Sequence, residues 1–250
     1  MQKLIEDNCK CSFNKDKLNI PEYANHLNID IGLSFSACHT NQWIKKQHDL
    51  FVISIEALPY NVEKLLEGNQ TSFHHREKSH YLNKDYINEK CYILPCAITN
   101  EDSNSVEFFQ TKDSGQCSIY EPPKTRDIYQ IDSIINVPSF KLKELLDIIN
   151  YSDKIQYVEF LKIDVQGADL DIVKSGGTSL QEKVVYLCLE PEIIYGSKDN
   201  NSIQSIASYM ESINFVRVQL PTTSDPTYIN KKYSHLFPPN KYDITCIQNN

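Results

Sequence analysis

An apolar strand that ends in an aspartate and passes through a glycine turn into a helix constrains this chain more than any other feature. Residues 160–173 read Phe-Leu-Lys-Ile-Asp-Val-Gln-Gly-Ala-Asp-Leu-Asp-Ile-Val. The apolar residues predict a strand over 158–164, and the amphipathic pattern after the glycine predicts a helix over 168–174. In an open α/β sheet, ligands bind beyond the carboxyl ends of the strands. We therefore expect Asp164, the last residue of this strand, to face a ligand site.

Two upstream segments repeat this pattern and also carry an acidic residue where the strand ends. Residues 27–31 predict a short buried strand that contains Asp30, and residues 50–55 predict a second one that leads to Glu56. A predicted helix follows each strand, as it does after Asp164. Because the carboxyl ends of parallel strands meet at one edge of a sheet, these three carboxylates predict a site for a small polar ligand.

The remaining predicted elements continue the alternation of strands and helices. We expect helices at about 36–46, from Pro59 onward, at 139–150 and at 203–212, strands at 91–98, 184–189, 215–219 and 242–247, and a hairpin of 106–109 with 118–120. This order predicts a single doubly wound α/β domain over residues 27–250, with a mostly parallel sheet. The last two strands are expected to pair antiparallel at one edge. Residues 1–26 are expected to form an arm or an extra helix.

Composition and charge argue against several classes of partner. The net charge is −8 and there is no dense block of Lys and Arg, so a broad surface for nucleic acid or anionic membranes is not expected. The chain has no run of 18 apolar residues, so no membrane span is expected, and the N-terminus lacks the apolar core of a signal peptide. The eight cysteines are scattered through strands and loops, as is typical of free thiols in a reducing compartment, so we expect a cytoplasmic protein. The pair Cys9-x-Cys11 has no partner cluster, and no metal site is predicted from it.

The residues at the predicted strand ends suggest particular chemical roles. Gly32 permits a tight turn beside the N-terminus of a helix, but a dinucleotide-binding loop would have three glycines where this chain has one. Glu56 stands one βα unit after Asp30, where a carboxylate can accept hydrogen bonds from ribose hydroxyls. Asp164 alone suits a general base, a metal ligand or a helix cap.

Further candidate groups follow the next strand or lie in the polar segments. Glu190 and Glu192 follow the strand at 184–189, so they would lie in the same crevice, within reach of a substrate or a metal ion. Three histidines that could transfer protons are better explained as surface residues: His39, His74 and His75. The chain lacks the phosphate-binding loop of nucleoside triphosphatases, the nucleophile elbow of serine hydrolases and the His-Glu-x-x-His helix of zinc proteases.

The assembled motifs resemble the FkbM family of S-adenosylmethionine-dependent methyltransferases. The clearest match is residues 161–173, which are similar to a family pattern of Lys-Ile-Asp-Val-Glu-Gly followed by an acidic, apolar helix. Residues 30–36 resemble the family loop Asp-Val-Gly-Ala-Asn-x-Gly, and residues 55–61 resemble its Phe-Glu-Pro segment. The resemblance implies a Rossmann-like class I methyltransferase domain with a seven-stranded sheet. It also implies an enzyme that methylates a hydroxyl of a sugar, a glycan or a small glycosylated metabolite.

The same resemblance implies a role for each motif residue toward the cofactor S-adenosylmethionine. Asp30, Gly32 and Ser34 would border its methionine moiety, Glu56 would hold its ribose, Ala57 and Ala97 would border its adenine, and Asp164 would face its sulfonium. Asp164 is then the first candidate for the base that collects the proton of the acceptor hydroxyl, Glu190 the second and a histidine of the polar insertion the third. A divalent metal held by Asp164 and Glu190 is an alternative way to acidify the hydroxyl. The insertions at 68–90 and 111–130 are expected to shape the acceptor pocket.

Three residues depart from the family pattern. Ser34 replaces Asn, Ser36 replaces the last glycine of the loop, and Gln166 replaces the Glu that precedes the glycine. A side chain at position 36 crowds the expected site of the methionine carboxylate, and Gln166 removes a negative charge beside Asp164. These departures leave open a catalytically silent binding domain. An N-methyltransferase acting on nucleic acid or protein is less favoured, because the chain lacks the Pro-Pro-aromatic segment after Asp164 and carries a net negative charge.

Overall fold

The central sheet of the computed structural model is built from the strands that the sequence predicts to be buried. The structure describes residues 11–68, 81–193, 195, 201–218 and 225–236. Its four innermost strands are almost completely buried: β3 (His26–Ile31), β4 (Leu50–Ile55), β9 (Val158–Ile163) and β10 (Val184–Leu189). Near-continuous apolar runs explain this burial, because both faces of a parallel sheet are covered by helices.

Seven strands form this sheet in the order β11–β12–β10–β9–β3–β4–β5. From β10 to β5 (Cys91–Leu94) all neighbours are parallel, whereas β12 (Thr227–Asn230) is antiparallel to both β10 and β11 (Phe215–Val218). The prediction of a mostly parallel sheet with an antiparallel edge is therefore confirmed, although the strand that pairs with β11 there is β12 and not the predicted strand at 242–247. The strand order reverses between β3 and β9, and the crevice at such a reversal is where α/β proteins bind ligands.

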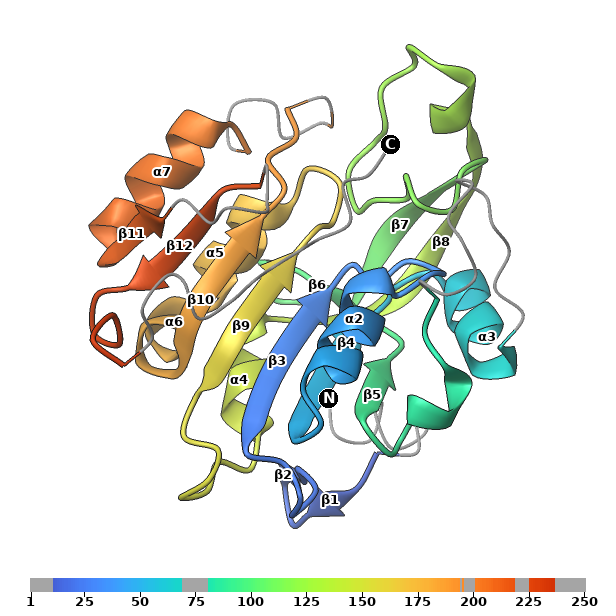
Figure 1. Cartoon of the computed structure of the whole chain (residues 1–250). Coiled ribbons are helices and arrows are strands. Elements are labelled where there is room, and N and C mark those ends of the chain that lie inside the picture. The colour runs from blue at the N-terminus through green and yellow to red at the C-terminus, as the bar shows by residue number, and fades with distance from the viewer. Residues whose placement is uncertain (1–10, 69–80, 194, 196–200, 219–224, 237–250) are drawn as a thin grey trace.

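Helices lie on both faces of the sheet, as the doubly wound prediction requires (Figure 1). One face is covered by α2 (Cys38–Lys46) and α3 (Pro59–Glu67), whose buried side chains pack on β4 and β5. The other face is covered by α4 (Leu142–Ile148), α5 (Asp169–Ser175), α6 (Gly177–Lys183) and α7 (Ile203–Ser212), which share the largest apolar cluster. No helix of the described residues has the length and apolar character needed to cross a membrane.

A second, three-stranded sheet corrects two of the predictions. The expected strand at 91–98 breaks at Pro95, which has no N–H to donate, and β6 (Ala97–Ile98) leaves the main sheet to pair with β8 (Ile131–Phe140). The predicted hairpin of 106–109 with 118–120 is also wrong, because β7 (Ser105–Thr111) pairs with β8 and meets Ser118 only in one isolated bridge. Figure 1 shows β7 and β8 projecting beyond the carboxyl ends of the parallel strands.

Other elements differ from the sequence predictions at the ends of the chain and around α4. The predicted helix at 139–150 begins only at Leu142, and α6, β8 and β12 were not predicted. The described part of the N-terminal arm is a hairpin of β1 (Phe13–Asn14) and β2 (Lys17–Leu18) rather than a helix, and Leu18 is fully buried in the core. Two short 3-10 helices, η2 (Lys84–Tyr86) and η3 (Asp127–Tyr129), complete the described elements. The predicted strand at 242–247 lies outside the described residues.

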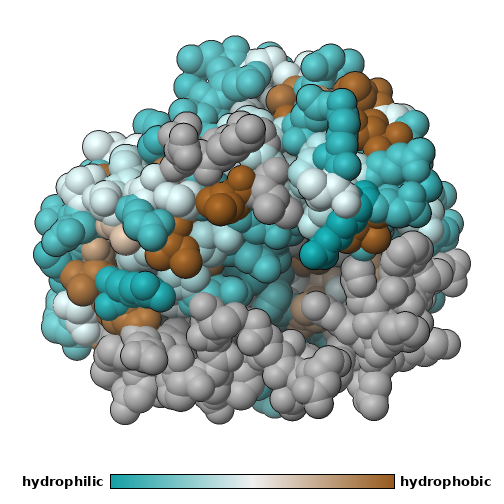
Figure 2. All heavy atoms as spheres, turned by 90° about the horizontal axis from the view of Figure 1, so that it is seen from above, coloured by the Kyte–Doolittle hydropathy of each residue, from teal (hydrophilic) through white to brown (hydrophobic). Residues whose placement is uncertain are grey.

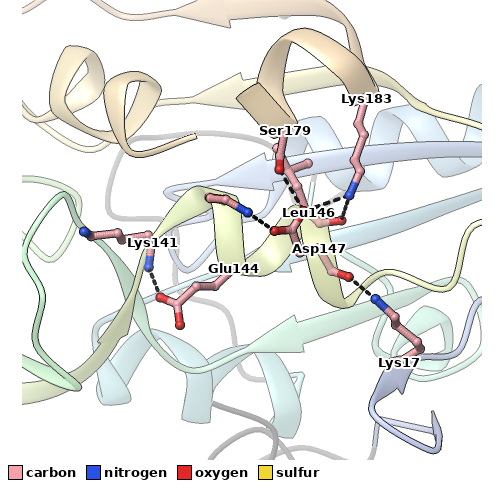
Figure 3. Close-up of polar contacts among 8 residues, drawn as sticks. Lys17, Lys141, Glu144, Leu146, Asp147, Ser179 and Lys183 are labelled. Atoms are coloured by element: carbon pink, nitrogen blue, oxygen red, sulfur yellow. Dashed lines mark hydrogen bonds and ion pairs between the residues drawn. The ribbon is translucent and has the colours of Figure 1, made fainter. Parts of the chain in front are cut away.

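A cluster of charges around Asp147 connects α4 with α6 and β2 (Figure 3). The carboxylate of Asp147 accepts hydrogen bonds from Lys143, from Ser179 at 2.7 Å and from Lys183 at 2.8 Å, and its carbonyl accepts one from Lys17. Burial raises the pKa of Asp147, but these hydrogen bonds outweigh it and hold the pKa well below its usual value. The cluster therefore holds β2, α4 and α6 together on the side of the domain opposite α2.

The ends of β3 and β9 approach each other so closely that only glycine fits between them. Gly32 has a φ of +86°, and a Cβ atom there would lie 1.7 Å from the carbonyl oxygen of Asp164. The backbone N–H of Asp164 donates to the carbonyl of Ile31 at 2.9 Å, which continues the pairing of the two strands into the loops. This contact brings the loop after β3 and the residues after β9 into one wall of the crevice.

We predict that Gly32→Ala destabilises the protein by about 3 kcal/mol or more, because it adds a steric clash with backbone to the cost of a left-handed alanine. Gly177→Ala is the matched control: Gly177 has a φ of +51°, but a Cβ atom there meets nothing within 4 Å. The control is expected to cost about 1 kcal/mol. Urea unfolding of both variants measures the difference, and equal losses would contradict the close approach of the two strands.

Candidate functional site

A cavity of about 240 Å³ opens at the carboxyl ends of β3, β4 and β9. Figure 2 shows the molecule from this side, where mainly hydrophilic residues border a hollow near the middle of the view. Seven of the eight residues predicted from the sequence line the cavity: Gly32, Ser34, Glu56, Ala57, Ala97, Asp164 and Glu190. The fold therefore brings residues from β6 and from the ends of β3, β4, β9 and β10 to one site.

Asp30 is the predicted residue that does not line the cavity. Its side chain is 2% exposed and accepts a hydrogen bond from Thr40 Oγ1 of α2 at 2.8 Å. Burial raises the pKa of Asp30 to about 6, although Lys162 and Thr40 act in the opposite direction. Asp30 lies behind the wall of the cavity and supports it from the sheet.

The carboxylate of Glu56 ties the loop after β3 to the start of α3. Its Oε2 accepts from the backbone N–H of Ser34 at 2.6 Å, and its Oε1 accepts from that of Leu58 at 2.8 Å and from Asn61 Nδ2 at 3.3 Å. Ser34 has a φ of +57°, so the loop turns its N–H toward the carboxylate in a left-handed conformation. Burial raises the pKa of Glu56 to about 7 despite these hydrogen bonds.

Each oxygen of a carboxylate can accept about two hydrogen bonds. Oε1 of Glu56 accepts two and Oε2 accepts one, so one acceptor position of Oε2 remains for a ligand. Glu56 can therefore accept hydrogen bonds from the loop after β3 and from one hydroxyl of a ligand at the same time.

A buried lysine controls the charge at the other end of the cavity. Lys162 lies on β9, its side chain is 3% exposed, and its Nζ donates to Asp164 Oδ2 at 2.7 Å. The side chain of Asp164 is 23% exposed and reaches the cavity wall. Burial of the ammonium group alone would lower the pKa of Lys162, but Asp164, Asp30 and Glu190 outweigh burial and keep the pKa above its usual value.

Asp164 and Glu190 form a pair in which the two carboxyl groups differ in charge. Burial alone would raise the pKa of Asp164, but the charge of Lys162 and hydrogen bonds from Glu190 and Lys162 hold it below the usual range. The charge of Asp164, together with burial, raises the pKa of Glu190 far above its usual range. At neutral pH Asp164 is therefore the carboxylate and Glu190 is the neutral acid that donates to it.

The residues after β9 are fastened to a segment that follows β7. Gln166 Nε2 donates to Asp164 Oδ1 at 3.1 Å, and the hydroxyl of Tyr195 lies 3.2 Å from Gln166 Oε1. Ser118 Oγ donates to the carbonyl of Gln166 at 2.8 Å, and Tyr120 donates to Asp171 on α5. Residues 114–117 and Ile119 line the cavity, so this part of the predicted insertion at 111–130 does border the site.

The described part of the other predicted insertion, at 68–90, contributes no residue to the cavity wall. Leu82 donates its N–H to the carbonyl of Ser36 at 3.1 Å, and Tyr81 packs edge-on against Phe35. These contacts brace the loop after β3 from outside. His74 and His75 lie outside the described residues, whereas His39, interpreted from the sequence as a surface residue, lines the cavity and helps to lower the pKa of Asp164.

Several site residues were missed by the sequence interpretation, and only some carried a usable signal. Lys162 was a lone charged residue inside an apolar strand, which signals a paired buried charge. Tyr195 and Gln116 stand in irregular segments and carried no such signal, although the hydroxyl of Tyr195 contacts Gln116 at 3.1 Å. Within the described residues, no group of three His, Cys, Asp or Glu side chains is arranged to hold a metal ion.

The fold and the site together define a Rossmann-like α/β protein with a ligand cavity at the reversal of its strand order. The family model described as the methyltransferase FkbM domain matches residues 31–217. The chain belongs to this methyltransferase family, as its sequence motifs predicted. A comparison with curated proteins found no match.

Two solved structures are similar to this chain at a low level. One is the Methanococcus jannaschii fibrillarin pre-rRNA processing protein, with 11% identity, a TM-score of 0.41, and coverage of 86% of this chain and 70% of the other. The second is the aminoglycoside resistance methyltransferase NpmB1, with 12% identity, a TM-score of 0.41, and coverage of 84% of this chain and 89% of the other. Likeness at this level says nothing of the substrate of this chain.

We predict that Lys162→Met destabilises the protein by about 3–5 kcal/mol at pH 8, because it leaves buried carboxylates without their cation. The loss is expected to be smaller at pH 5. Without Lys162, the folded-state pKa of Asp164 rises above its unfolded-state value, and that of Asp30, already about 6, rises further. The destabilisation is therefore absent at low pH and appears as the pH rises through these folded-state values. Urea unfolding at the two pH values measures this difference.

Lys112→Met is the control for this variant, since Lys112 pairs with Asp127 on the surface, where the two side chains are 43% and 85% exposed. It is expected to cost about 1 kcal/mol or less at both pH values. A loss that is the same at pH 5 and pH 8 for Lys162→Met would contradict the assigned role of the lysine.

Proposed function

We propose that this methyltransferase transfers the methyl group of S-adenosylmethionine to a hydroxyl oxygen of a sugar, a glycan or a small glycosylated metabolite. The proposal rests on membership of the FkbM family and on one observation at the site: the carboxyl group of Asp164 lies at the wall of the cavity and is paired with the buried ammonium group of Lys162 at 2.7 Å. When bound, S-adenosylmethionine supplies a methyl group already activated on a sulfonium. The residues of this chain then have to bind, orient and collect a proton.

The cavity has the polarity that this cofactor requires. Phe108 packs in one apolar cluster with Ala57 and Ala97, and Ile98 follows Ala97 on β6. All four residues line the cavity, and their apolar side chains suit the flat face of an adenine ring. The open acceptor position of Glu56 suits a ribose hydroxyl, and the loop of Gly32 and Ser34 suits the methionine end. At the far end, the negative charge of Asp164 suits a sulfonium.

The acceptor hydroxyl has to lose its proton as its oxygen gains the methyl group. The bound cofactor would supply the methyl group, and the O–H proton of the acceptor would pass to a carboxylate of this chain. Asp164 is a weak base in the ground state, but it can accept a hydrogen bond from the hydroxyl and take the proton as the oxygen becomes acidic along the reaction. Glu190, which already carries a proton, keeps Asp164 oriented. Neutral polar groups of Ser114 and Gln116 face the same space and suit a hydroxylated acceptor.

The departures from the family pattern are compatible with an active enzyme. Ser36 does not occupy the left-handed region of φ, so its backbone does not require the glycine of the family pattern. Gln166 does not weaken the charge of Asp164, since its amide donates to that carboxylate. The sequence left open a catalytically silent binding domain. The binding test described next distinguishes this alternative from a methyltransferase that binds its cofactor.

We predict that isothermal titration detects binding of S-adenosylmethionine and S-adenosylhomocysteine, with NAD as the negative control. Glu56→Ala is expected to lose at least about tenfold in affinity, because it removes a charged acceptor and frees the loop of Ser34. Glu107→Ala, on the exposed side of β7, is the matched control and should bind normally. Absence of binding by the unmodified protein would reject the proposed function and favour a silent domain.

We predict that Asp164→Asn lowers turnover by about 100-fold or more while the affinity for S-adenosylmethionine changes little, because the carboxylate is needed for the acceptor proton. Turnover is measured as release of S-adenosylhomocysteine with a panel of glycans and glycosides. Asp127→Asn, whose side chain is 85% exposed, is the control. Equal loss of affinity in Asp164→Asn and Glu56→Ala would contradict the division of roles.

We predict that the affinity for S-adenosylmethionine falls by up to about tenfold between pH 8 and pH 6. The pKa of Glu56 is raised to about 7, so its carboxylate is mostly ionised at pH 8 and mostly protonated at pH 6, where it accepts hydrogen bonds less well. Isothermal titration at the two pH values measures the effect. Glu56→Gln should bind weakly and remove most of this pH dependence, and an unchanged dependence in that variant would assign it to another group.

A further inference from the structure

Gln166 is held in an uncommon conformation by contacts on three sides. Its φ is +57°, and the next residue, Gly167, has a φ of +96°. A Cβ atom on Gly167 would lie 2.6 Å from Cβ of Tyr195, so the tyrosine packs directly on this turn. Ser118 holds the carbonyl of Gln166 at 2.8 Å. The side chain of Gln166 is thereby turned back toward Asp164.

The chemistry of its neighbours fixes the direction of the Gln166 amide. An ionised carboxylate only accepts hydrogen bonds, so the NH₂ group must face Asp164 Oδ1, at 3.1 Å. The amide oxygen then faces the hydroxyl of Tyr195, which can donate to it across 3.2 Å. The reverse orientation would place the amide oxygen against the carboxylate.

Gln166 is one of three donors to Asp164. The others are Lys162, at 2.7 Å, and the protonated carboxyl of Glu190. A carboxylate has about four acceptor positions, so these donors leave one for a ligand in the cavity. The set of donors thus determines both the charge of Asp164 and the position of its remaining lone pair.

A glutamate at position 166, as in the family pattern, would change this arrangement. When ionised it has no donor for Asp164 and adds a third carboxyl group beside the pair. When protonated it can donate to Asp164, but only over the pH range in which it keeps its proton. The amide of glutamine donates at every pH.

We propose that Gln166 is a positioning residue which, held by Tyr195, adds to the stabilisation of the ionised form of Asp164 and directs the free lone pair of this carboxylate at the cavity. The proposal deepens the proposed function, on which it rests only for the catalytic role of Asp164.

The charged and titratable groups that surround Asp164 come from every element packed against it. They are Lys162 on β9, Asp30 on β3, His39 on α2, Asp169 on α5, Cys188 on β10, and Glu190 and Glu192 after β10. None of them is altered by a substitution at position 166, so a change in the titration of Asp164 in such a variant reports on Gln166.

The test is a carbon-13 NMR titration of the side-chain carboxyl groups in the full chain, labelled at Asp and Glu. Its signal for Asp164 is assigned by its loss in Asp164→Asn. Gln166→Glu and Gln166→Leu are both expected to raise the titration midpoint of Asp164 by about one pH unit or more, the first by adding a carboxyl group and the second by removing a donor. Tyr195→Phe keeps Gln166 but frees its amide, so it should shift the midpoint in the same direction by less.

Gln110→Leu is the matched control, because the side chain of Gln110 accepts a hydrogen bond from Ser133 at 3.3 Å on the exposed part of β7 and contacts neither Tyr195 nor Asp164. It should leave the midpoint of Asp164 unchanged. An unchanged midpoint in Gln166→Glu and Gln166→Leu would overturn the proposal, and Tyr195→Phe provides a second test if either variant fails to fold. The titration needs neither cofactor nor acceptor, so it decides on Gln166 even if the protein fails to bind S-adenosylmethionine.

Discussion

The buried ammonium group of Lys162 is the interaction on which the site depends. Strand β9 places it in the crevice where the strand order reverses, and Asp30, Asp164 and Glu190 converge on it there. Without this positive charge the carboxyl groups would have to bind protons or move apart. Buried ion pairs contribute little net stability compared with apolar packing, so stability alone does not account for the lysine. Its effect is to hold one carboxylate ionised at a cavity wall while the neighbouring carboxyl remains neutral. That asymmetry is what a group that receives a proton needs.

The backbone makes the two ends of the cavity parts of one unit. Gly32 allows the loop after β3 to touch the carbonyl of Asp164, and the N–H of Gly32 donates to the carbonyl of Ile55 at the end of β4. Glu56, the next residue, then accepts the N–H of Ser34. The loop of Gly32 and Ser34 is therefore fixed between the strand of Glu56 and the strand of Asp164. Main-chain contacts, rather than flexible side chains, therefore set the spacing between Glu56 and Asp164. A displacement of this loop would move both carboxylates.

The sequence predicted most of the main sheet and little of the second one, for physical reasons. Strands such as those at 50–55 and 184–189 are apolar on both faces, and this pattern can be recognised without knowing their neighbours. Strand β8 is half exposed and contains Pro138, so its sequence pattern is that of a loop. Its strand conformation depends on pairing with β6 and β7, which the local sequence does not reveal. The strand-end carboxylates were predictable because the end of a parallel strand fixes its location. Tyr195 and the hydrogen bonds of Gln166 were not, because they join irregular segments far apart in the sequence, and no local pattern encodes such a contact.

The residues that depart from the family pattern occupy positions where hydrogen bonds remain satisfied. Ser34 adopts a left-handed conformation and still delivers its N–H to Glu56, and Gln166 adopts another and donates to Asp164. A non-glycine residue in the left-handed conformation costs up to about 2 kcal/mol unless a contact compensates for it. A chain that had lost its function would therefore not be expected to keep such a residue beside each of the two carboxylates. Here each such residue delivers an N–H group to a carboxylate at the cavity. Two of the six left-handed non-glycine residues in the described part of the chain thus make a hydrogen bond to a carboxylate of the cavity, which favours a retuned methyltransferase site over an abandoned one.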